Sequence, residues 1–514
     1  MRVSGARRAI GRYGEHSAAV TVGLMALAYA VVFSWLSIAR HRAFASGRFD
    51  LGNMEQAIWS TLQGRLLEST ETGGEQFSRF GAHVDPILVV LAPLYAVWSS
   101  PEALLVAQAA IVATGAIPAF LLGRRWLGDD RLGLAVAAVY LLYPPLQFAT
   151  LFDFHPVTLA APLLLFCIWT AEVGAYVPLA IFGTLAALTQ EQVGLALIGL
   201  ALWMALRHPE RRRAAGVMAA AAAAWVVVSV AVIIPRFSLT GGNPQIRRYD
   251  ALGEGEGGVL ASLFTRPWEV VEVLATPGRA AYLLLLLLPL LALSLLAPLL
   301  LLPAVPQLLI NLLAADGPPQ TIHYHYAAVL TPFLIASATL GLARLRGRER
   351  PAWISRALVR PGRVAAGAVA AGVLAGVLLG PLPFWRQLPV GYNGVSHHAF
   401  TRDAHAQAMA RAVALVPPDA SVSASNSAGA HLSGRRRIHL FPEIDDARWI
   451  LVDVRRPDPS GGVRKTLRPV EHALGVEAVV RDPAWQLVVD EAGVRLFRRV
   501  EATAAGSAGT VRSG

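Results

Sequence analysis

The sequence predicts an α-helical multi-pass membrane protein with a small C-terminal α/β domain. Its 514 residues are 55% hydrophobic and only 15% charged. Uncharged apolar runs recur over the first three quarters of the chain, and no charged residue occurs from Ala280 to Ala315. Because about 20 apolar residues in a helix span the hydrocarbon core of a bilayer, these runs predict transmembrane helices.

Eleven apolar runs predict eleven membrane spans. They lie at residues 17–38, 102–122, 131–148, 156–171, 175–190, 192–206, 214–235, 280–298, 299–315, 325–343 and 364–382. The transmembrane domain is therefore expected over residues 17–382, with a long loop at 39–85. Another apolar stretch, 86–98, is too short for a span and fits a re-entrant or interfacial segment.

Basic loops set the expected topology. Arginines gather at 124–131, 207–213 and 344–363, and the positive-inside rule places all three loops in the cytoplasm if 86–98 does not cross. Residues 1–16 are then cytoplasmic, and the loop 39–85 and the C-terminal domain are extracytoplasmic. If 86–98 crossed alone, the first two basic loops would change sides. A pair of short crossings within 86–122 is the alternative.

The C-terminal part, residues 383–500, is expected to be an α/β domain. A helix is predicted at 398–416 and another near 463–474. Strands are predicted at 420–424, 437–441, 448–453, 477–481, 485–490 and 493–498. Residues 501–514 are rich in Ala, Gly, Ser and Thr, which is typical of a disordered tail.

Composition also limits the function. The net charge of +11 is explained by basic loops beside spans, so nucleic acid is not an expected partner. The chain has a single cysteine, Cys167, and therefore no intrachain disulfide. It has no glycine-rich nucleotide-binding motif, so use of a nucleotide sugar is not supported.

Ionisable residues cluster on the predicted outer side, at the ends of spans. Such residues are costly near lipid and often line a functional cavity, although each one alone is equally compatible with a solvated loop end. The clusters contain Asp50, His83, Asp85, Asp153, His155, Glu191, Arg247, Arg248 and His325. Their common location predicts one site at the outer membrane surface.

The loop 39–85 carries a predicted helix. Leu51, Met54, Ile58 and Leu62 recur at helical spacing, which indicates an amphipathic helix on the membrane surface. Asp50 precedes it and is either its N-cap or a carboxylate held at the surface for chemistry. Glu55 is assigned to the wet face of this helix.

Two kinds of ligand are suggested by the outer clusters. Aspartate and histidine together suit Mn²⁺ or Mg²⁺, with Asp50, Asp85, Asp153 and His155 as the candidate ligands, although their spacing is not diagnostic. Guanidinium groups pair with phosphate oxygens in a bidentate way, which explains basic residues on an outer loop. Arg247, Arg248 and Arg279 are the candidates for phosphate.

A family resemblance rests on several motifs taken together. They are Phe49-Asp50-Leu51-Gly52-Asn53, His83-Val84-Asp85-Pro86, Asp153-Phe154-His155-Pro156, Gln190-Glu191 and His323-Tyr324-His325-Tyr326. Over roughly residues 40–455 the chain resembles a bacterial family of predicted membrane proteins, domain of unknown function 2079. Its layout is similar to the GT-C superfamily of glycosyltransferases, which use polyprenyl-phosphate sugars on the extracytoplasmic face.

The resemblance implies a bacterial cell-membrane glycosyltransferase that passes a sugar to an envelope glycan, lipid or protein. Outer acids of such enzymes serve as catalytic base or metal ligand, which implies these roles for Asp50, Asp85 and Asp153. His83, His155, Glu191, Arg247, Arg248, Arg279 and His325 are the expected substrate-binding residues. The first loop lacks the Asp-X-Asp or Glu-X-Asp pair of the superfamily, so the metal and the base stay open.

Two other functions stay open. A transporter or flippase of a lipid-linked or anionic solute would place ionisable residues near the midplane and often shows repeats. The chain has no evident internal repeat, and its ionisable residues lie at span ends. A non-catalytic membrane scaffold is the other alternative, but it would not need so many acids at the membrane edge.

Overall fold

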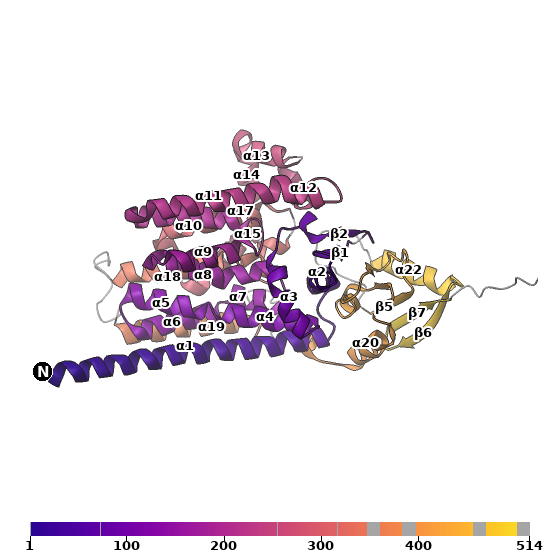
Figure 1. The fold of residues 1–514 in the computed structure, drawn as a ribbon, viewed down its shortest axis with the longest axis horizontal. Helices are drawn as coiled ribbons and strands as arrows, with labels where there is room; N and C mark the ends of the chain where they lie inside the picture. The colour runs from indigo at the N-terminus through magenta and orange to yellow at the C-terminus, as the bar shows by residue number, and fades with distance from the viewer. Residues whose placement is uncertain are drawn as a thin grey trace, which may run out of the picture.

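The computed structural model describes residues 2–71, 73–253, 255–315, 317–346, 360–382, 397–455 and 469–500. The expected tail at 501–514 lies outside the described residues, as does most of the link between the two domains. The described chain forms a helical bundle with an α/β domain at one end (Figure 1). The N-terminus lies at the opposite end of the bundle.

The longest helix, α1 (Arg2–Arg42), runs along the bundle (Figure 1). One face buries Val22, Phe33 and Leu36, whereas Leu24 and Trp35 are exposed. Large apolar side chains on the outward face are expected where a helix meets lipid. The neighbouring helices α4 (Pro101–Ala113) and α5 (Ala116–Leu127) pack against it.

Helices account for the rest of the bundle. They are α6 (Asp130–Leu142), α7 (Pro144–Leu151), α8 (Ala160–Val173), α9 (Tyr176–Ala187), α10 (Val193–Arg207), α11 (Arg212–Val228), α12 (Ile234–Phe237), α13 (Gly255–Thr265), α14 (Pro267–Leu274), α15 (Pro277–Leu287), α16 (Pro298–Leu301), α17 (Val305–Leu313), α18 (Thr331–Arg346) and α19 (Pro361–Leu379).

Every run predicted to span the membrane contains helix. By length and composition, five helical stretches in the described chain can cross a membrane, and two bent helix pairs bring the number to seven. Several other apolar helices, α9 and α10 among them, are shorter. The count of eleven therefore stays a prediction. The short stretch 86–98 forms α3 (Ile87–Val97).

The first loop is folded between the bundle and the C-terminal domain. It contains a π-helical turn at Arg48–Gly52, helix α2 (Asn53–Leu62) and a hairpin of β1 (Glu68–Thr70) and β2 (Gln76–Ser78). Leu51 and Ile58 are fully buried in a cluster with residues of α3. The predicted helix exists, but its apolar face packs on protein.

The C-terminal domain is built on a five-stranded sheet of order β4-β3-β5-β7-β6. Its strands are β3 (Val422–Ala424), β4 (Ile438–Leu440), β5 (Trp449–Asp453), β6 (Trp485–Glu491) and β7 (Val494–Arg499), and its helices are α20 (Ala404–Leu415), α21 (Asn426–Gly429) and α22 (Pro469–Arg481). Strand β3 pairs in parallel with β4 and β5, and β7 lies antiparallel between β5 and β6.

One predicted strand of this domain is wrong. Residues 477–481 form the end of α22, because Val476 and Val479 lie three residues apart and are both buried against the sheet. The start of the helix predicted near 463–474 falls outside the described residues. The predicted helix at 398–416 corresponds to α20, and the other predicted strands correspond to β3 to β7.

Candidate functional site

Asp50 and His155 meet at the end of the bundle that faces the C-terminal domain. Nε2 of His155 lies 3.2 Å from Oδ1 of Asp50. The other ring nitrogen, Nδ1, donates to the backbone carbonyl of Asp153, 2.9 Å away. Because Nδ1 carries the hydrogen of this bond, Nε2 is the ring nitrogen that faces the carboxylate of Asp50. The side chain of Asp50 is 26% exposed and that of His155 only 7%.

The π-helical turn that carries Asp50 is held by the C-terminal domain. Its first residue, Arg48, is buried, and its Nη2 donates to the carbonyl of Ile438, 2.9 Å away. Asn426 of α21 accepts a hydrogen bond from the backbone N–H of Phe49 at 2.9 Å. Asp50 does not cap α2, because the N-cap position is Gly52 and no side chain caps it. The capping alternative was therefore wrong, and π-turns of this kind are frequent at functional sites.

Asp153 is buried beneath this pair. Oδ1 accepts a hydrogen bond from Arg40 of α1, and Oδ2 accepts one from the backbone N–H of Gly47 at 2.7 Å. Burial raises the pKa of Asp153, while Arg40 acts to lower that pKa and the charge of Asp50 raises it further. Both oxygens of Asp153 are thus engaged by the protein. Asp153 therefore supports the turn that carries Asp50, and neither of its oxygens is left for a ligand.

His83, Asp85 and Glu191 form a second, adjacent network. Oε1 of Glu191 lies 3.0 Å from Nδ1 of His83, and Oε2 accepts a hydrogen bond from the N–H of Val84 at 2.9 Å. Burial acts to raise the pKa of Glu191, but His83 and the hydrogen bonds outweigh it and lower that pKa. Nε of Arg79 donates to Asp85 at 2.7 Å. The net effect on Asp85 is a raised pKa, because its burial outweighs the charge of Arg79.

Aromatic rings connect His155 to the basic loop. The ring of His155 stacks against Phe152 and against His325, with centroid distances of 5.3 Å and 3.7 Å. His325 in turn lies 4.2 Å from the ring of Tyr326. His325 thus joins His155 to the segment that Arg248 contacts through Tyr326.

Arginines close both ends of this stack. Arg40 lies over Phe152 at 5.5 Å, and Arg248 lies over Tyr326 at 5.8 Å and donates to its hydroxyl at 3.3 Å. Cations over aromatic faces are attracted by the ring quadrupole. Nε of Arg248 is buried without a hydrogen-bond partner in the described structure. Arg248 is therefore the predicted phosphate ligand that the fold brings to the site.

The other two candidate arginines do not join it. Nε of Arg279 donates to the carbonyl of Leu312, and Nη2 donates to that of Ala314 at 3.3 Å. Its guanidinium therefore binds backbone carbonyls at the end of α17 and does not reach the site. Arg247 is exposed, and no interaction links it to the described site.

The predicted metal ligands do not form a coordination group among the described residues. Asp153 is occupied by Arg40 and Gly47, and Asp85 is paired with Arg79. The described group that brings three ligand atoms within 4.8 Å is His439, Asp445 and Asp446, in the C-terminal domain. Within it, Asp446 already accepts from Arg437 at 2.6 Å and lies 2.8 Å from His439.

Several site residues were missed from the sequence. Glu55 was assigned to the wet face of α2, but it is only 4% exposed, and it accepts hydrogen bonds from Tyr95, at 2.7 Å, and from Ser433. The C-terminal domain covers that face, which helical periodicity does not reveal. Arg40 and Gln108 were missed because they read as a span end and as part of an apolar helix. Gln108 accepts from the N–H of His155 at 2.9 Å.

Comparisons with known proteins agree on family and fold. A family model described as predicted membrane protein DUF2079 matches residues 40–461. The structure of ArnT from Cupriavidus metallidurans bound to undecaprenyl phosphate aligns with a TM-score of 0.50 and 12% identity, covering 93% of this chain and 98% of ArnT. The apo structure gives 0.52 and 14%, covering 94% and 98%.

ArnT is a GT-C glycosyltransferase, and at these identities the likeness concerns the fold. The archaeal oligosaccharyltransferase AglB from Archaeoglobus fulgidus aligns with a TM-score of only 0.40 and 12% identity, over 84% of this chain and 69% of AglB. No curated protein sequence matches this chain.

Proposed function

This chain belongs to the DUF2079 family of predicted membrane proteins and has a GT-C-like fold, and on that basis we propose that it is a glycosyltransferase. It moves a sugar from a polyprenyl-phosphate donor to a hydroxyl of an envelope acceptor. The observation that carries the proposal is the Asp50–His155 pair, a partly exposed carboxylate held by a buried imidazole. The binding of undecaprenyl phosphate by ArnT supports the choice of donor.

Asp50 is the proton acceptor of the proposed reaction. The acceptor oxygen attacks the anomeric carbon and its proton passes to Asp50, while the bond from that carbon to the phosphate oxygen breaks. Polyprenyl phosphate leaves with the electron pair of that bond. A positioned carboxylate contributes about 10²–10⁴-fold to such a step. His155 holds Asp50 in place from its buried side.

Arg248 is the proposed partner of the leaving phosphate. It lies at the end of the stack that begins at His155, so its charge acts in the same site as Asp50. Preorganised cations stabilise charge that develops on a leaving group. Asp153 and Glu191 support this site by accepting hydrogen bonds from the backbone of Gly47 and Val84, and Asp85 pairs with the side chain of Arg79. A divalent cation does not fit Asp85 and Asp153 as they are paired here, so no step is assigned to one.

We propose that the site lies on the extracytoplasmic side. The basic loops 124–131 and 207–213 lie at the end of the bundle away from the C-terminal domain, as the positive-inside rule requires for a cytoplasmic end. Asp50 and His155 lie at the other end. The lipid tail of the donor then remains in the bilayer while its phosphate reaches Arg248.

Sugar transfer in isolated membranes tests the proposal. Membranes containing the full chain are incubated with radiolabelled polyprenyl-phosphate sugars and cell-envelope extract. We expect transfer with the unaltered chain and a loss of at least about 10²-fold with Asp50→Asn. Asp250→Asn is the matched control, because Asp250 is exposed and lies outside the described network.

Three outcomes contradict the proposal. Full transfer by Asp50→Asn at equal expression removes Asp50 as the base. No transfer from any donor, with folded protein in the membrane, favours a transporter or flippase. Tolerance of alanine at Asp50, Asp85 and Asp153 would instead favour a scaffold.

A further inference from the structure

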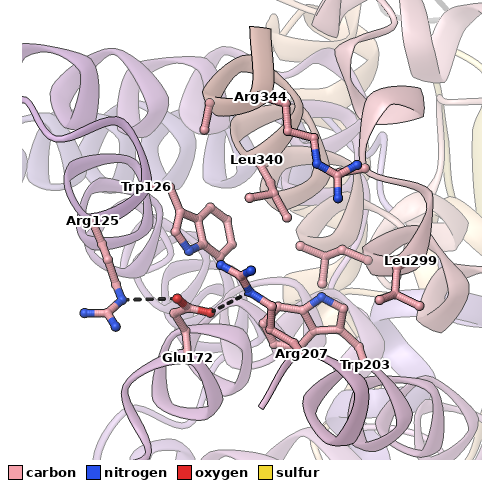
Figure 2. A pocket seen from close by; sticks show the side chains of 11 residues that line it. Arg125, Trp126, Glu172, Trp203, Arg207, Leu299, Leu340 and Arg344 are labelled. Carbon is pink, nitrogen blue, oxygen red and sulfur yellow. Dashed lines mark hydrogen bonds and ion pairs between the residues drawn. The ribbon is translucent and has the colours of Figure 1, made fainter. Parts of the chain in front are cut away.

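A second charged site lies at the end of the bundle away from the C-terminal domain. There a cavity of about 620 Å³ is lined by the ends of α5, α8, α10 and α18 and by α16. Figure 2 shows the side chains that line it. Its charged residues are Arg125, Glu172, Arg207 and Arg344. Cavities of roughly 300–1,000 Å³ are the usual size of small-molecule sites.

The cavity carries a surplus of positive charge. Glu172 is only 3% exposed, and its carboxylate lies 3.2 Å from Nε of Arg125 and 4.0 Å from Nε of Arg207. These contacts use the inner nitrogen of each guanidinium (Figure 2). Arg344 also lines the cavity and donates to the carbonyl of Leu296. Arg125 and Arg207 carry two positive charges against the one negative charge of Glu172, and this net positive charge attracts an anion.

The arginines of the cavity wall keep donors for a ligand. The side chains of Arg125 and Arg207 are 46% and 45% exposed, and the described structure gives their terminal Nη atoms no partner. A guanidinium whose Nη groups are unused matches phosphate oxygens in its fork geometry. Glu172 thus positions two guanidinium groups and leaves their ligand-binding atoms available.

The rest of the cavity wall is apolar. Trp126 and Trp203 lie beside the arginines, and Leu299 and Leu340 form the opposite wall (Figure 2). On either side of Leu299 in the chain, Leu295 and Leu302 are 55% and 43% exposed, which extends the apolar surface outward. A phosphate ligand that also covers leucines is an amphiphile. Tryptophan is enriched where such ligands lie, at the membrane–water interface.

We propose that this cavity binds the phosphate head group of an anionic phospholipid. The phosphate lies against the Nη atoms of Arg125 and Arg207, and the acyl chains extend over the leucines. Basic pockets between transmembrane helices on the cytoplasmic side bind such head groups. This end of the bundle carries the basic loops that predict a cytoplasmic location. The inference is independent of the proposed sugar transfer.

Native mass spectrometry of the full chain in detergent tests the proposal. Phosphatidylglycerol and phosphatidylcholine are titrated in parallel, and their dissociation constants are compared. We expect phosphatidylglycerol to bind at least about tenfold tighter, since each basic residue adds roughly fivefold near a membrane surface. Arg207→Gln and Arg344→Gln should each weaken phosphatidylglycerol about fivefold and leave phosphatidylcholine unchanged.

A control variant sharpens the test. Arg213→Gln is the matched control, because Arg213 is exposed at the same end and does not line the cavity. Arg344→Gln keeps the test decisive if Arg207→Gln does not fold, because Arg344 lies outside the contacts of Glu172.

Three results overturn the proposal. Equal affinity for the two lipids removes the anionic specificity. An equal loss with Arg213→Gln shows a general charge effect. Displacement of phosphatidylglycerol by millimolar inorganic phosphate identifies a site for a soluble phosphate instead of a lipid.

Discussion

Nε2 of His155 lies 3.2 Å from the carboxylate of Asp50, across a sequence separation of 105 residues. His155 is fixed from below, since its Nδ1 donates to the carbonyl of Asp153. Asp50 is therefore the member of the pair that is open to solvent. This geometry distinguishes Asp50 from the other two outer aspartates, because Asp153 pairs with Arg40 and Asp85 pairs with Arg79.

Replacing His155 should lower the rate of sugar transfer. His155→Gln removes the imidazole whose Nε2 lies 3.2 Å from Oδ1 of Asp50. We expect transfer to fall about tenfold to a hundredfold, because Asp50 loses the contact that fixes its position. Transfer is measured in membranes at equal expression. Full transfer by His155→Gln would show that the imidazole does not position Asp50.

The stability of the fold should depend on pH through Glu55. Burial raises the pKa of Glu55 to about 7, although hydrogen bonds from Ser433 and Tyr95 act to lower it. The unfolded chain releases this proton near pH 4.5. The folded state therefore binds more protons between these values, and stability falls as pH rises from about 4.5 to 7, by on the order of 3 kcal/mol.

Thermal unfolding of the purified chain in detergent measures this effect. The midpoint should fall between pH 5 and 7 and level off above pH 7. Glu55→Gln should flatten this dependence and raise the midpoint at pH 8, because its side chain carries no charge to bury. An equally steep fall in Glu55→Gln would assign the effect to another group.

Removing one partner of the buried ion pair between Arg79 and Asp85 should destabilise the fold. Their side chains are 5% and 1% exposed. Arg79→Met should cost about 3–5 kcal/mol, because it leaves the charge of Asp85 buried and unpaired. Adding Asp85→Asn should recover part of that loss. A double-mutant cycle on thermal unfolding measures the coupling.

An exposed ion pair is the control for this cycle. Arg411 and Glu491 are each 54% exposed, so breaking that pair should cost about 1 kcal/mol or less. Simple additivity of Arg79→Met and Asp85→Asn would contradict the coupling inferred from the buried contact.

The C-terminal domain should act on catalysis through Asn426. Asn426→Ala removes the acceptor of the Phe49 N–H, next to Asp50. We expect a stability loss of about 1 kcal/mol and a larger fall in kcat than in substrate affinity, because Asp50 loses its fixed position. Ser427→Ala in the same helix is the control, since its hydroxyl has no partner in the described structure. Equal effects of the two variants would refute the role of Asn426.

Local patterns in the sequence were enough to predict the class of the protein and several residues of the candidate site. Apolar runs predicted the helices, because the cost of burying charge in lipid acts on each segment separately. The motifs predicted which acids, histidines and arginines would gather at one end, and the structure brings Asp50, His155, His325 and Arg248 together there.

Only the tertiary structure decided what each of these residues does. Arg40 pairs with Asp153, which lies 113 positions away in the chain. Ser433 of the C-terminal domain donates a hydrogen bond to Glu55. Arg279 donates to backbone carbonyls. Burial and the partner of a charge determine whether that group is free for chemistry. Both depend on contacts between distant segments, and such contacts leave no periodic signal in the chain.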